Sequence, residues 1–329
     1  MKTKILFIER RSGGSPSLER VFRRIAENLP DDEFEVAFQQ APYGDGALNV
    51  IKNLLSFRPK PADIYHIAGH VTYLAYRVPA DRTVVTIPDA FLLRIRKGIR
   101  RWVLKKLYFE VPIKRAAVVT VISDSTRLEI RNLLPDARSD ISVIGCPLTE
   151  NDTEPKGEFN DARPRILHIG TAANKNLPAL IEAVAASGWL LRIVGPANAA
   201  TKSFLDATDV EYEWLSDLDE HGITETYRTS DIVSFCTTYE GFGLPIIEAQ
   251  AMEKPLITSD IEPHRSVAGE GALFVDPENA RDIRNAIERI VADPELRRAL
   301  VEAGRENVKR FEPRKIAEEY AQLYRDMIE

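Results

Sequence analysis

Short apolar runs alternate with segments of helical periodicity along the whole chain. In the first half the apolar runs cover residues 4–8, 34–38, 63–68, 84–89, 117–123 and 141–144, and in the second half 165–169, 189–196, 210–215 and 231–236. Between the first two runs, Leu18, Val21, Phe22 and Ile25 recur at the spacing of a helix face. Strands that alternate with helices predict an α/β fold with parallel, doubly wound sheets.

The length of the chain, 329 residues, favours two domains over one core. Residues 149–163 are polar and lack periodicity, so they are predicted to be an interdomain linker. We therefore expect a first domain over residues 1–148, a second over 164–312, and a C-terminal helix over 313–329.

A glycine-rich segment with two glutamates follows the apolar run at residues 231–236. Glu240, Gly241 and Gly243 fall where a strand gives way to a helix, and Pro245 suits the first helical turn. The carboxyl edge of an open α/β sheet is where ligands bind, and a glycine-rich entry to a helix favours an anion. A carboxylate only accepts hydrogen bonds, so Glu248 is suited to a vicinal diol such as a ribose. The segment predicts a nucleotide-like ligand.

The same segment carries a family resemblance. Glu240 and Glu248 enclose Gly-Phe-Gly-Leu-Pro, and the stretches 255–259 and 268–277 continue the pattern. The string resembles the family-4 retaining glycosyltransferases of GT-B fold, the glycosyl transferases group 1. This resemblance implies two Rossmann-like domains with an interdomain cleft, the acceptor side in the first domain, the nucleotide-sugar donor in the second, and a C-terminal helix that crosses back to the first. An acidic helix cap alone would not require the whole string.

The resemblance also assigns roles to residues of the second domain. It places Glu240 beside the donor sugar, Lys175 at the donor diphosphate and Glu248 at the ribose, with Gly195 near the nucleobase. Gly14, in the first turn of the chain, would face the donor phosphates. The expected donor-binding residues are thus Gly14, Lys175, Gly195, Glu240, Gly241, Phe242, Gly243, Leu244 and Glu248, and Glu240 and Lys175 are the expected catalytic residues.

The acceptor side and two departures from the family pattern leave alternatives open. His66 and His70 bracket a strand end, and Asp89 ends the run at 84–89, so these three are the acceptor-side candidates. Pro88 stands where the family usually has His, and Thr171 stands where it usually has Arg. The departures favour, as an alternative, a non-catalytic relative that binds a nucleotide sugar or a partner protein. An epimerase that acts on a UDP-sugar is a third interpretation.

The net charge of −6 conceals an asymmetry between the halves of the chain. Residues 1–150 carry a balance of +7, and residues 151–329 carry −13. The segment Arg94 to Phe109 interleaves seven basic residues with apolar ones. It predicts either a helix that lies on an anionic membrane surface or a solvated basic face whose apolar side packs on the core. One basic helix in an acidic chain makes a nucleic-acid partner a poor fit.

The expected activity is transfer of a sugar, with retention at the anomeric carbon, from a nucleoside-diphosphate sugar, namely a UDP-sugar or a GDP-sugar. The expected acceptor is a glycan or a lipid-linked molecule in polysaccharide biosynthesis. The family uses no metal, no spacing in the chain resembles a metal site, and no other cofactor is expected. Only Cys146 and Cys236 are present, which indicates buried free thiols in a reducing compartment. With no apolar run of transmembrane length, we expect a cytoplasmic protein, peripheral at the inner face of the membrane if the basic segment binds there.

Overall fold

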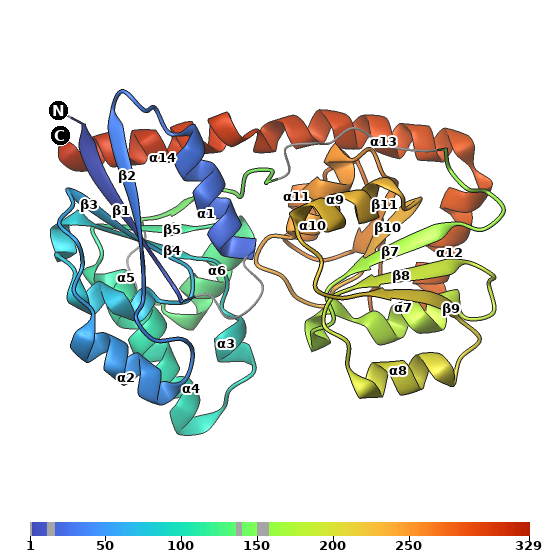
Figure 1. Ribbon diagram of the computed structural model, residues 1–329, viewed down its shortest axis with the longest axis horizontal. Coiled ribbons are helices and arrows are strands. Elements are labelled where there is room, and N and C mark those ends of the chain that lie inside the picture. The colour runs from blue at the N-terminus through green and yellow to red at the C-terminus, as the bar shows by residue number, and fades with distance from the viewer. Residues whose placement is uncertain (1, 12–16, 136–139, 150–157) are drawn as a thin grey trace. The chain divides into compact units, whose positions relative to one another are not determined.

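The computed structural model describes residues 2–11, 17–135, 140–149 and 158–329 (Figure 1). The chain forms two compact units, Met1–Thr149 with Phe311–Glu329, and Glu150–Arg310. Each unit contains one six-stranded sheet in which every strand pair is parallel. The prediction of two doubly wound, Rossmann-like α/β domains is therefore confirmed. Within the predicted linker, residues 150–157 lie outside the described residues.

The sheet of the first unit has the strand order β2-β1-β3-β4-β5-β6. Its strands are β1 (Thr3–Glu9), β2 (Phe34–Gln40), β3 (Ile64–Ala68), β4 (Thr83–Ile87), β5 (Val118–Val121) and β6 (Ile141–Val143). β1, β3 and β4 are buried almost throughout, as expected of parallel strands covered on both faces. The order reverses between β1 and β3, which is where open α/β sheets bind ligands, and His70 follows β3.

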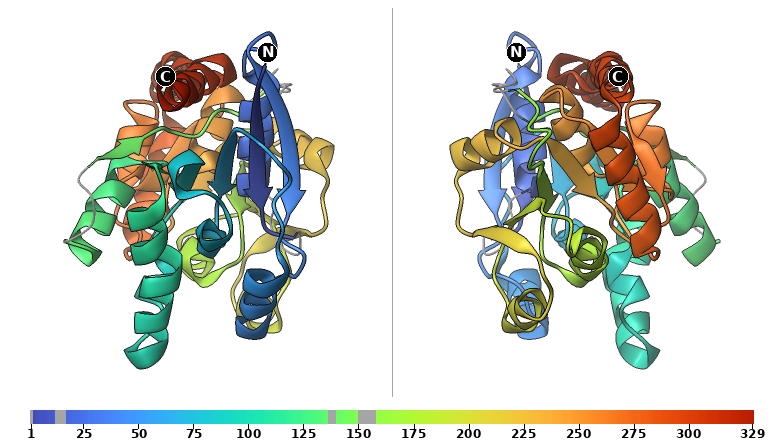
Figure 2. Two further views of the ribbon diagram at one scale, coloured as in Figure 1. Left: turned by 90° about the vertical axis from the view of Figure 1, so that its left-hand side faces the viewer. Right: turned by 90° about the vertical axis from the view of Figure 1, so that its right-hand side faces the viewer.

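Helices of the first unit come from both ends of the chain. They are α1 (Ser17–Asn28), α2 (Ala47–Ser56), α3 (Phe91–Arg94), α4 (Gly98–Leu104), α5 (Val111–Arg115), α6 (Asp124–Leu133) and α14 (Pro313–Ile328), with 3-10 turns at Thr72–Arg77 and Ala80–Arg82. α14 lies beside α1 (Figures 1 and 2), where the rings of Phe22 and Tyr320 meet edge to face and Arg325 binds both carboxylate oxygens of Glu33.

The second unit has the strand order β12-β11-β10-β7-β8-β9. Its strands are β7 (Arg165–Ile169), β8 (Leu190–Val194), β9 (Glu211–Leu215), β10 (Ile232–Phe235), β11 (Leu256–Ser259) and β12 (Leu273–Val275). Its helices are α7 (Leu177–Val184), α8 (Ala199–Asp206), α9 (Glu220–Arg228), α10 (Leu244–Ala251), α11 (His264–Ala268), α12 (Ala280–Ala292) and α13 (Pro294–Val308), with 3-10 turns at Ala173–Lys175 and Lys309–Phe311. The order reverses between β7 and β10.

The basic segment predicted as one helix is divided. α3 ends at Arg94, and α4 begins at Gly98, whose φ is +57°. From there α4, a π-helical turn at Lys105–Glu110 and α5 follow one another without a break, as one rod at the edge of the first unit (Figure 2). A single helix is wrong because the left-handed conformation at Gly98 interrupts the helical backbone.

Candidate functional site

The centre of the candidate site is an ion pair between the turns that follow β7 and β10. Lys175 Nζ donates a hydrogen bond of 2.7 Å to Glu240 Oε1, and both side chains are mostly buried, at 21% and 15% exposed. β7 and β10 are the neighbouring strands at which the strand order of the second sheet reverses. The pair therefore lies where open α/β sheets bind ligands, and it unites the two residues expected to be catalytic.

Asn174 holds the two turns together. The backbone N–H of Thr238 donates to Asn174 O at 2.9 Å. In the other direction, Asn174 Nδ2 donates to Tyr239 O at 3.0 Å and to Glu240 Oε1 at 3.3 Å. Glu240 thus accepts from Lys175 and from Asn174 through the same oxygen. The sequence interpretation did not single out Asn174, although it lies directly before Lys175.

Besides Glu240, Lys175 lies near an aromatic ring and two imidazoles that are neutral at pH 7. Its ammonium group lies 5.0 Å from the centre of the Phe235 ring. Burial, together with the smaller effect of the charge of Lys175, lowers the pKa of His168 to about 4 and that of His264 to about 3. Both imidazoles are therefore neutral at pH 7, so Lys175 carries the positive charge at this place. His264 is buried at the start of α11, where its ring nitrogens face the hydroxyl groups of Thr237 and Thr258.

α10 presents its N-terminus and one carboxylate to this edge of the sheet. Gly243 caps the helix at φ +105°, and a Cβ on it would come within 2.9 Å of Ile246 Cδ1, so the turn requires glycine. Glu248 is 4% exposed, and its Oε2 accepts a hydrogen bond of 2.7 Å from Tyr227 Oη. Gly241, Phe242 and Leu244 complete the turn, and Phe242 is buried.

The turn after β8 lies next to the turn after β7. Gly195 has φ +139°, and the carbon and oxygen atoms of the Thr171 side chain approach the position of its missing Cβ to 3.3 and 3.4 Å. The carbonyl of Gly195 accepts from Trp214 Nε1 at 2.8 Å and from Ser216 Oγ at 3.0 Å. Thr171 Oγ1 donates to Pro196 O at 2.8 Å. Thr171 therefore connects the two turns.

In the first unit, the turns after β3 and β4 carry two of the acceptor-side candidates. His70 is half-buried after Gly69, whose φ of +85° and contact with Leu18 leave no room for a side chain. Asp89 is half-buried, and its Oδ1 accepts from the backbone N–H of Phe91 at 2.8 Å, at the start of α3. Gly14 lies outside the described residues.

His66, the third acceptor-side candidate, is part of the core. Its ring is fully buried, with Nδ1 2.6 Å from Tyr324 Oη and Nε2 2.7 Å from Thr86 Oγ1. Burial lowers its pKa to about 3, so it is neutral at pH 7. Because both ring nitrogens are hydrogen-bonded inside the first unit, the geometry gives His66 a structural role. His70 and Asp89 then remain as the acceptor-side candidates, each in a turn that follows a strand.

Two further features concern metals and thiols. The part of the chain that the structure describes contains no group of three or more His, Cys, Asp and Glu side chains arranged to hold a metal ion. Cys146 and Cys236 are buried free thiols, as predicted, and burial raises the pKa of Cys236 to about 12.

Known proteins resemble this chain in sequence and in fold. Residues 150–307 match the family model of glycosyl transferases group 1. Among curated proteins, the chain is 24% identical to the alpha-D-kanosaminyltransferase of Streptomyces kanamyceticus, covering 70% of this chain and 64% of the relative. It is 27% identical to the O-antigen chain mannosyltransferase RfbU of Salmonella typhimurium, covering 63% and 58%. The chain thus spans about three fifths of the length of these relatives.

Solved structures show the same fold at low sequence identity. Sucrose-phosphate synthase from Thermosynechococcus elongatus superposes with a TM-score of 0.81 at 18% identity and covers 99% of both chains. Anabaena HepE in complex with UDP and glucose gives a TM-score of 0.75 at 16% identity, over 98% of this chain and 100% of that one. The chain thus has the GT-B fold, and its second unit matches the glycosyl transferases group 1 over residues 150–307.

Proposed function

We propose that the protein is a glycosyltransferase that transfers a sugar from a nucleoside-diphosphate sugar, with retention at the anomeric carbon. The observation that carries the proposal is the Lys175–Glu240 pair at the strand-order reversal of the unit that matches the family. A cation and a carboxylate at one sheet edge can bind the two chemically different parts of such a donor, its diphosphate and its sugar. Lys175 binds the diphosphate, and Glu240 binds the sugar and stabilises positive charge at its anomeric carbon.

The leaving diphosphate is stabilised by groups of this chain. Lys175 and the backbone N–H groups at the N-terminus of α10 supply positive charge and donors, so the reaction proceeds without a metal ion. Glu248 accepts hydrogen bonds from the ribose hydroxyls. We expect the nucleoside diphosphate of the donor to be UDP, with GDP as the second candidate, because a structural relative was solved with UDP and glucose. When the donor binds, its phosphate replaces Glu240 at Lys175, and Asn174 keeps Glu240 in position.

The acceptor is a glycan or a lipid-linked glycan. Support comes from relatives whose names specify an O-antigen chain mannosyltransferase and a capsular polysaccharide biosynthesis glycosyltransferase. His70 and Asp89 are the acceptor-side residues, since both lie at strand ends of the first sheet. Acceptor and donor would then be held by different units of the chain.

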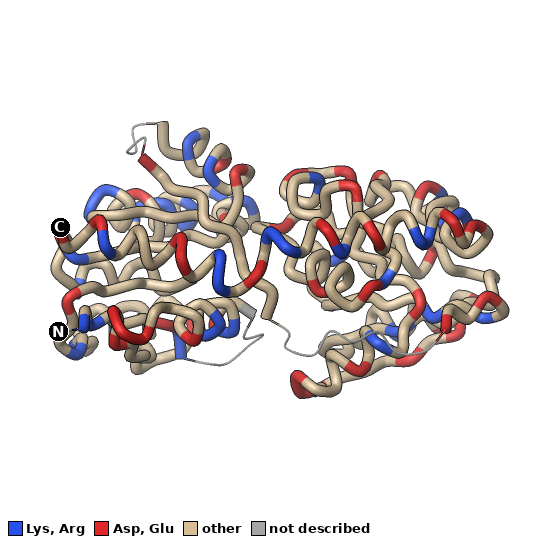
Figure 3. The backbone as a smooth tube through the Cα atoms, turned by 90° about the horizontal axis from the view of Figure 1, so that it is seen from above, with Lys and Arg blue, Asp and Glu red and all other residues tan. Residues whose placement is uncertain are grey.

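The basic segment binds an anionic membrane surface. In and beside α4, four apolar side chains are exposed: Ile95, Ile99, Trp102 and Val103. The same stretch bears closely spaced Lys and Arg residues, and Figure 3 marks such positions along the backbone. Exposed apolar side chains among cations are typical of a helix at a membrane interface. None of the described helices is both long and apolar enough to cross a bilayer, so the surface contact would be peripheral.

The test combines binding and transfer with the whole chain. Thermal shifts are measured with UDP, GDP, UDP-glucose and GDP-mannose in EDTA, and transfer is then assayed with the donor that binds. A ligand at a hundred times its Kd adds about 2.7 kcal/mol, which raises Tm by roughly 5 to 10 °C for units of this size. Binding without consumption would indicate a non-catalytic relative, and donor consumption without transfer would indicate an epimerase.

A further inference from the structure

A cavity lies at the opposite edge of the second sheet from the Lys175–Glu240 pair. Its volume is about 440 Å³, within the range of small-molecule sites. It is lined by Asp231, just before β10, by Lys254 and Pro255, just before β11, and by one side of α13. Glu240 follows the other end of β10. Because the strands separate the two places, both can be occupied at once. We name this cavity the Lys254 cavity.

The walls of the Lys254 cavity are mostly apolar. Phe159, Pro255 and Val301 contribute the apolar side chains, beside charged residues of both signs that include Glu253, Glu302 and Arg305. Arg297 is fixed in the wall, because its guanidinium lies 3.9 Å from the centre of the Phe159 ring and donates to Ile290 O and Val291 O. These surfaces suit a ligand with a flat or branched apolar body.

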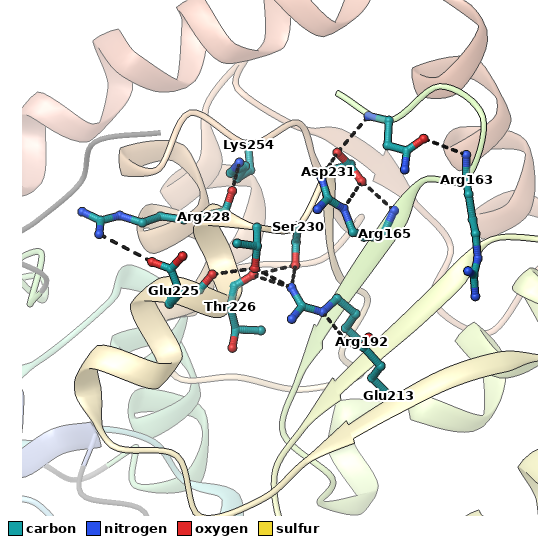
Figure 4. A network of polar contacts seen from close by, with 12 residues as sticks. Arg163, Arg165, Arg192, Glu213, Glu225, Thr226, Arg228, Ser230, Asp231 and Lys254 are labelled. Carbon is teal, nitrogen blue, oxygen red and sulfur yellow. Dashed lines mark hydrogen bonds and ion pairs between the residues drawn. The ribbon is translucent and has the colours of Figure 1, made fainter. Parts of the chain in front are cut away.

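The one buried acid in the lining is already neutralised. Asp231 is 3% exposed, and Arg165 binds both of its oxygens, at 2.8 and 2.9 Å (Figure 4). The backbone N–H groups of Arg165 and Asn160 donate to the same carboxylate at 2.8 and 3.0 Å. These four hydrogen bonds, two of them from the Arg165 guanidinium, satisfy the Asp231 carboxylate, and the positive charge of Arg165 offsets part of its negative charge.

The buried cation in the lining has no such partner. Lys254 is 8% exposed, and its Nζ donates to Arg228 O at 2.7 Å (Figure 4). An ammonium group has three donors, and no carboxylate among the described residues forms an ion pair with Lys254. Burial lowers its pKa to about 8, while the nearby charges of Asp231 and Glu253 raise the pKa and that of Arg165 lowers it. A buried ammonium group bonded to one carbonyl is a place for an anion.

We propose that the Lys254 cavity binds a small organic anion whose apolar body packs against Phe159 and Val301 and whose carboxylate or phosphate meets Lys254. Arg298 and Arg305 also line the cavity, but each is ion-paired, Arg298 with Glu295 and Arg305 with Glu253 and Glu302, so the unpaired cation among the described residues of the lining is Lys254. The site is separate from the proposed donor site, and it would be a regulatory or second-substrate site on the same unit.

The test uses 2-naphthoate as the anion and 2-naphthalenemethanol as its neutral analogue, with calorimetry on the whole chain. We expect 2-naphthoate to bind the wild type more tightly than the alcohol. Lys254→Met, which keeps the stem and removes the charge, should weaken 2-naphthoate binding at least tenfold and leave the alcohol unchanged. Lys202→Met, at an exposed lysine of α8, is the matched control and should bind as the wild type does. Binding should also weaken above pH 8, since the free site then loses the ammonium proton.

Three results would overturn the proposal: no binding of 2-naphthoate to the wild type, equal binding to Lys254→Met, or displacement of 2-naphthoate by UDP. If Lys254→Met does not fold by circular dichroism, Val301→Trp decides, because the larger ring fills the cavity from α13. Undiminished binding of 2-naphthoate to folded Val301→Trp would place the ligand elsewhere.

Discussion

Lys175 Nζ and Glu240 Oε1 lie 2.7 Å apart, although the two residues are 65 positions apart in the sequence. The contact joins the turn after β7 to the turn after β10. The cation proposed for the donor diphosphate is therefore ion-paired with the carboxylate proposed for the donor sugar. Glu240 thus occupies the place at Lys175 that a phosphate would take.

Removing either partner of this pair should reduce transfer. Lys175→Met removes the charge that stabilises the leaving diphosphate, and Glu240→Gln removes the charge beside the anomeric carbon. We expect kcat to fall roughly 10²- to 10³-fold in each, by analogy with the loss of one stabilising donor. Initial rates at saturating donor measure it, with Lys202→Met as the control. A wild-type rate in either variant would exclude the proposed roles.

Asn174 should act as a positioning residue. Its side chain donates to Tyr239 O and Glu240 Oε1, and it keeps Glu240 in place once Lys175 binds phosphate. Hydrogen bonds to charged groups contribute about 1.5 to 3 kcal/mol, so Asn174→Ala should lower kcat at least tenfold with a smaller change in KM for the donor. Asn198→Ala removes the cap of α8 and is the control. An effect on KM alone would contradict the positioning role.

Glu248 should serve donor binding more than chemistry. A buried carboxylate that accepts the ribose hydroxyls makes charge-assisted hydrogen bonds, so Glu248→Gln should raise the Kd for the donor or for UDP about 10- to 100-fold. Calorimetry with UDP measures this change. Tyr227→Phe keeps the carboxylate but removes the hydroxyl group that donates to it at 2.7 Å. We expect a smaller loss of about 1 kcal/mol in the free energy of UDP binding. A variant that loses kcat while binding UDP normally would show that the role of Glu248 is chemical.

The fold could be predicted because its signals are local. Apolar runs, the helical spacing of Leu18 to Ile25 and the turn at Gly243 each depend on neighbouring residues, and each marks where a strand or helix begins or ends. The same signals placed Lys175 and Glu240 at strand ends. The division of the basic segment is not predicted, because its interleaved basic and apolar residues favour one continuous helix. The left-handed conformation of Gly98, which glycine permits but does not require, produces the break.

The pairing of distant side chains could not be predicted. His66 and His70 look alike in sequence, yet His66 points into the core against Tyr324, 258 positions away. The role of Asn174 depends on the turn after β10, and the burial of His264 depends on Thr237 and Thr258. Tertiary packing decides these contacts, and one sequence gives no sign of them apart from polar residue type.

His66 should make the first unit sensitive to acid. Its pKa is about 3 in the folded protein because of burial, against 6.5 as the ordinary value. Between these values the unfolded chain binds a proton that the folded chain does not, so stability is complete above pH 6.5 and is lost as pH falls. The loss from this residue is about 1.4 kcal/mol at pH 5.5. Between pH 7.5 and 5.5, the free energy of unfolding should therefore fall about 1.4 kcal/mol less in His66→Gln than in the wild type. Hydrogen exchange of the β3 amides measures this difference. An equal loss in both proteins would assign the acid sensitivity to other groups.

Membrane binding should depend on the cations of the basic segment. Replacing Arg96, Lys97 and Arg100 with Ser removes three charges, each contributing about 1 kcal/mol near an anionic surface. Affinity for vesicles with phosphatidylserine should therefore fall on the order of 100-fold, measured by co-sedimentation at fixed salt. Trp102→Ala, which removes an exposed ring, should weaken binding to the same vesicles further.

The alternative for this segment is a solvated basic face, and the control separates the two. Lys52, Lys60 and Arg82 are exposed cations of the first unit outside the segment, and their replacement with Ser changes net charge equally. If attraction depended on net charge alone, both triple variants would lose the same affinity. A face that docks must lose more in the Arg96, Lys97 and Arg100 variant, because those charges alternate with Ile95, Ile99 and Trp102, which enter the interface. Equal losses, or no binding by the wild type, would leave the segment as a solvated surface.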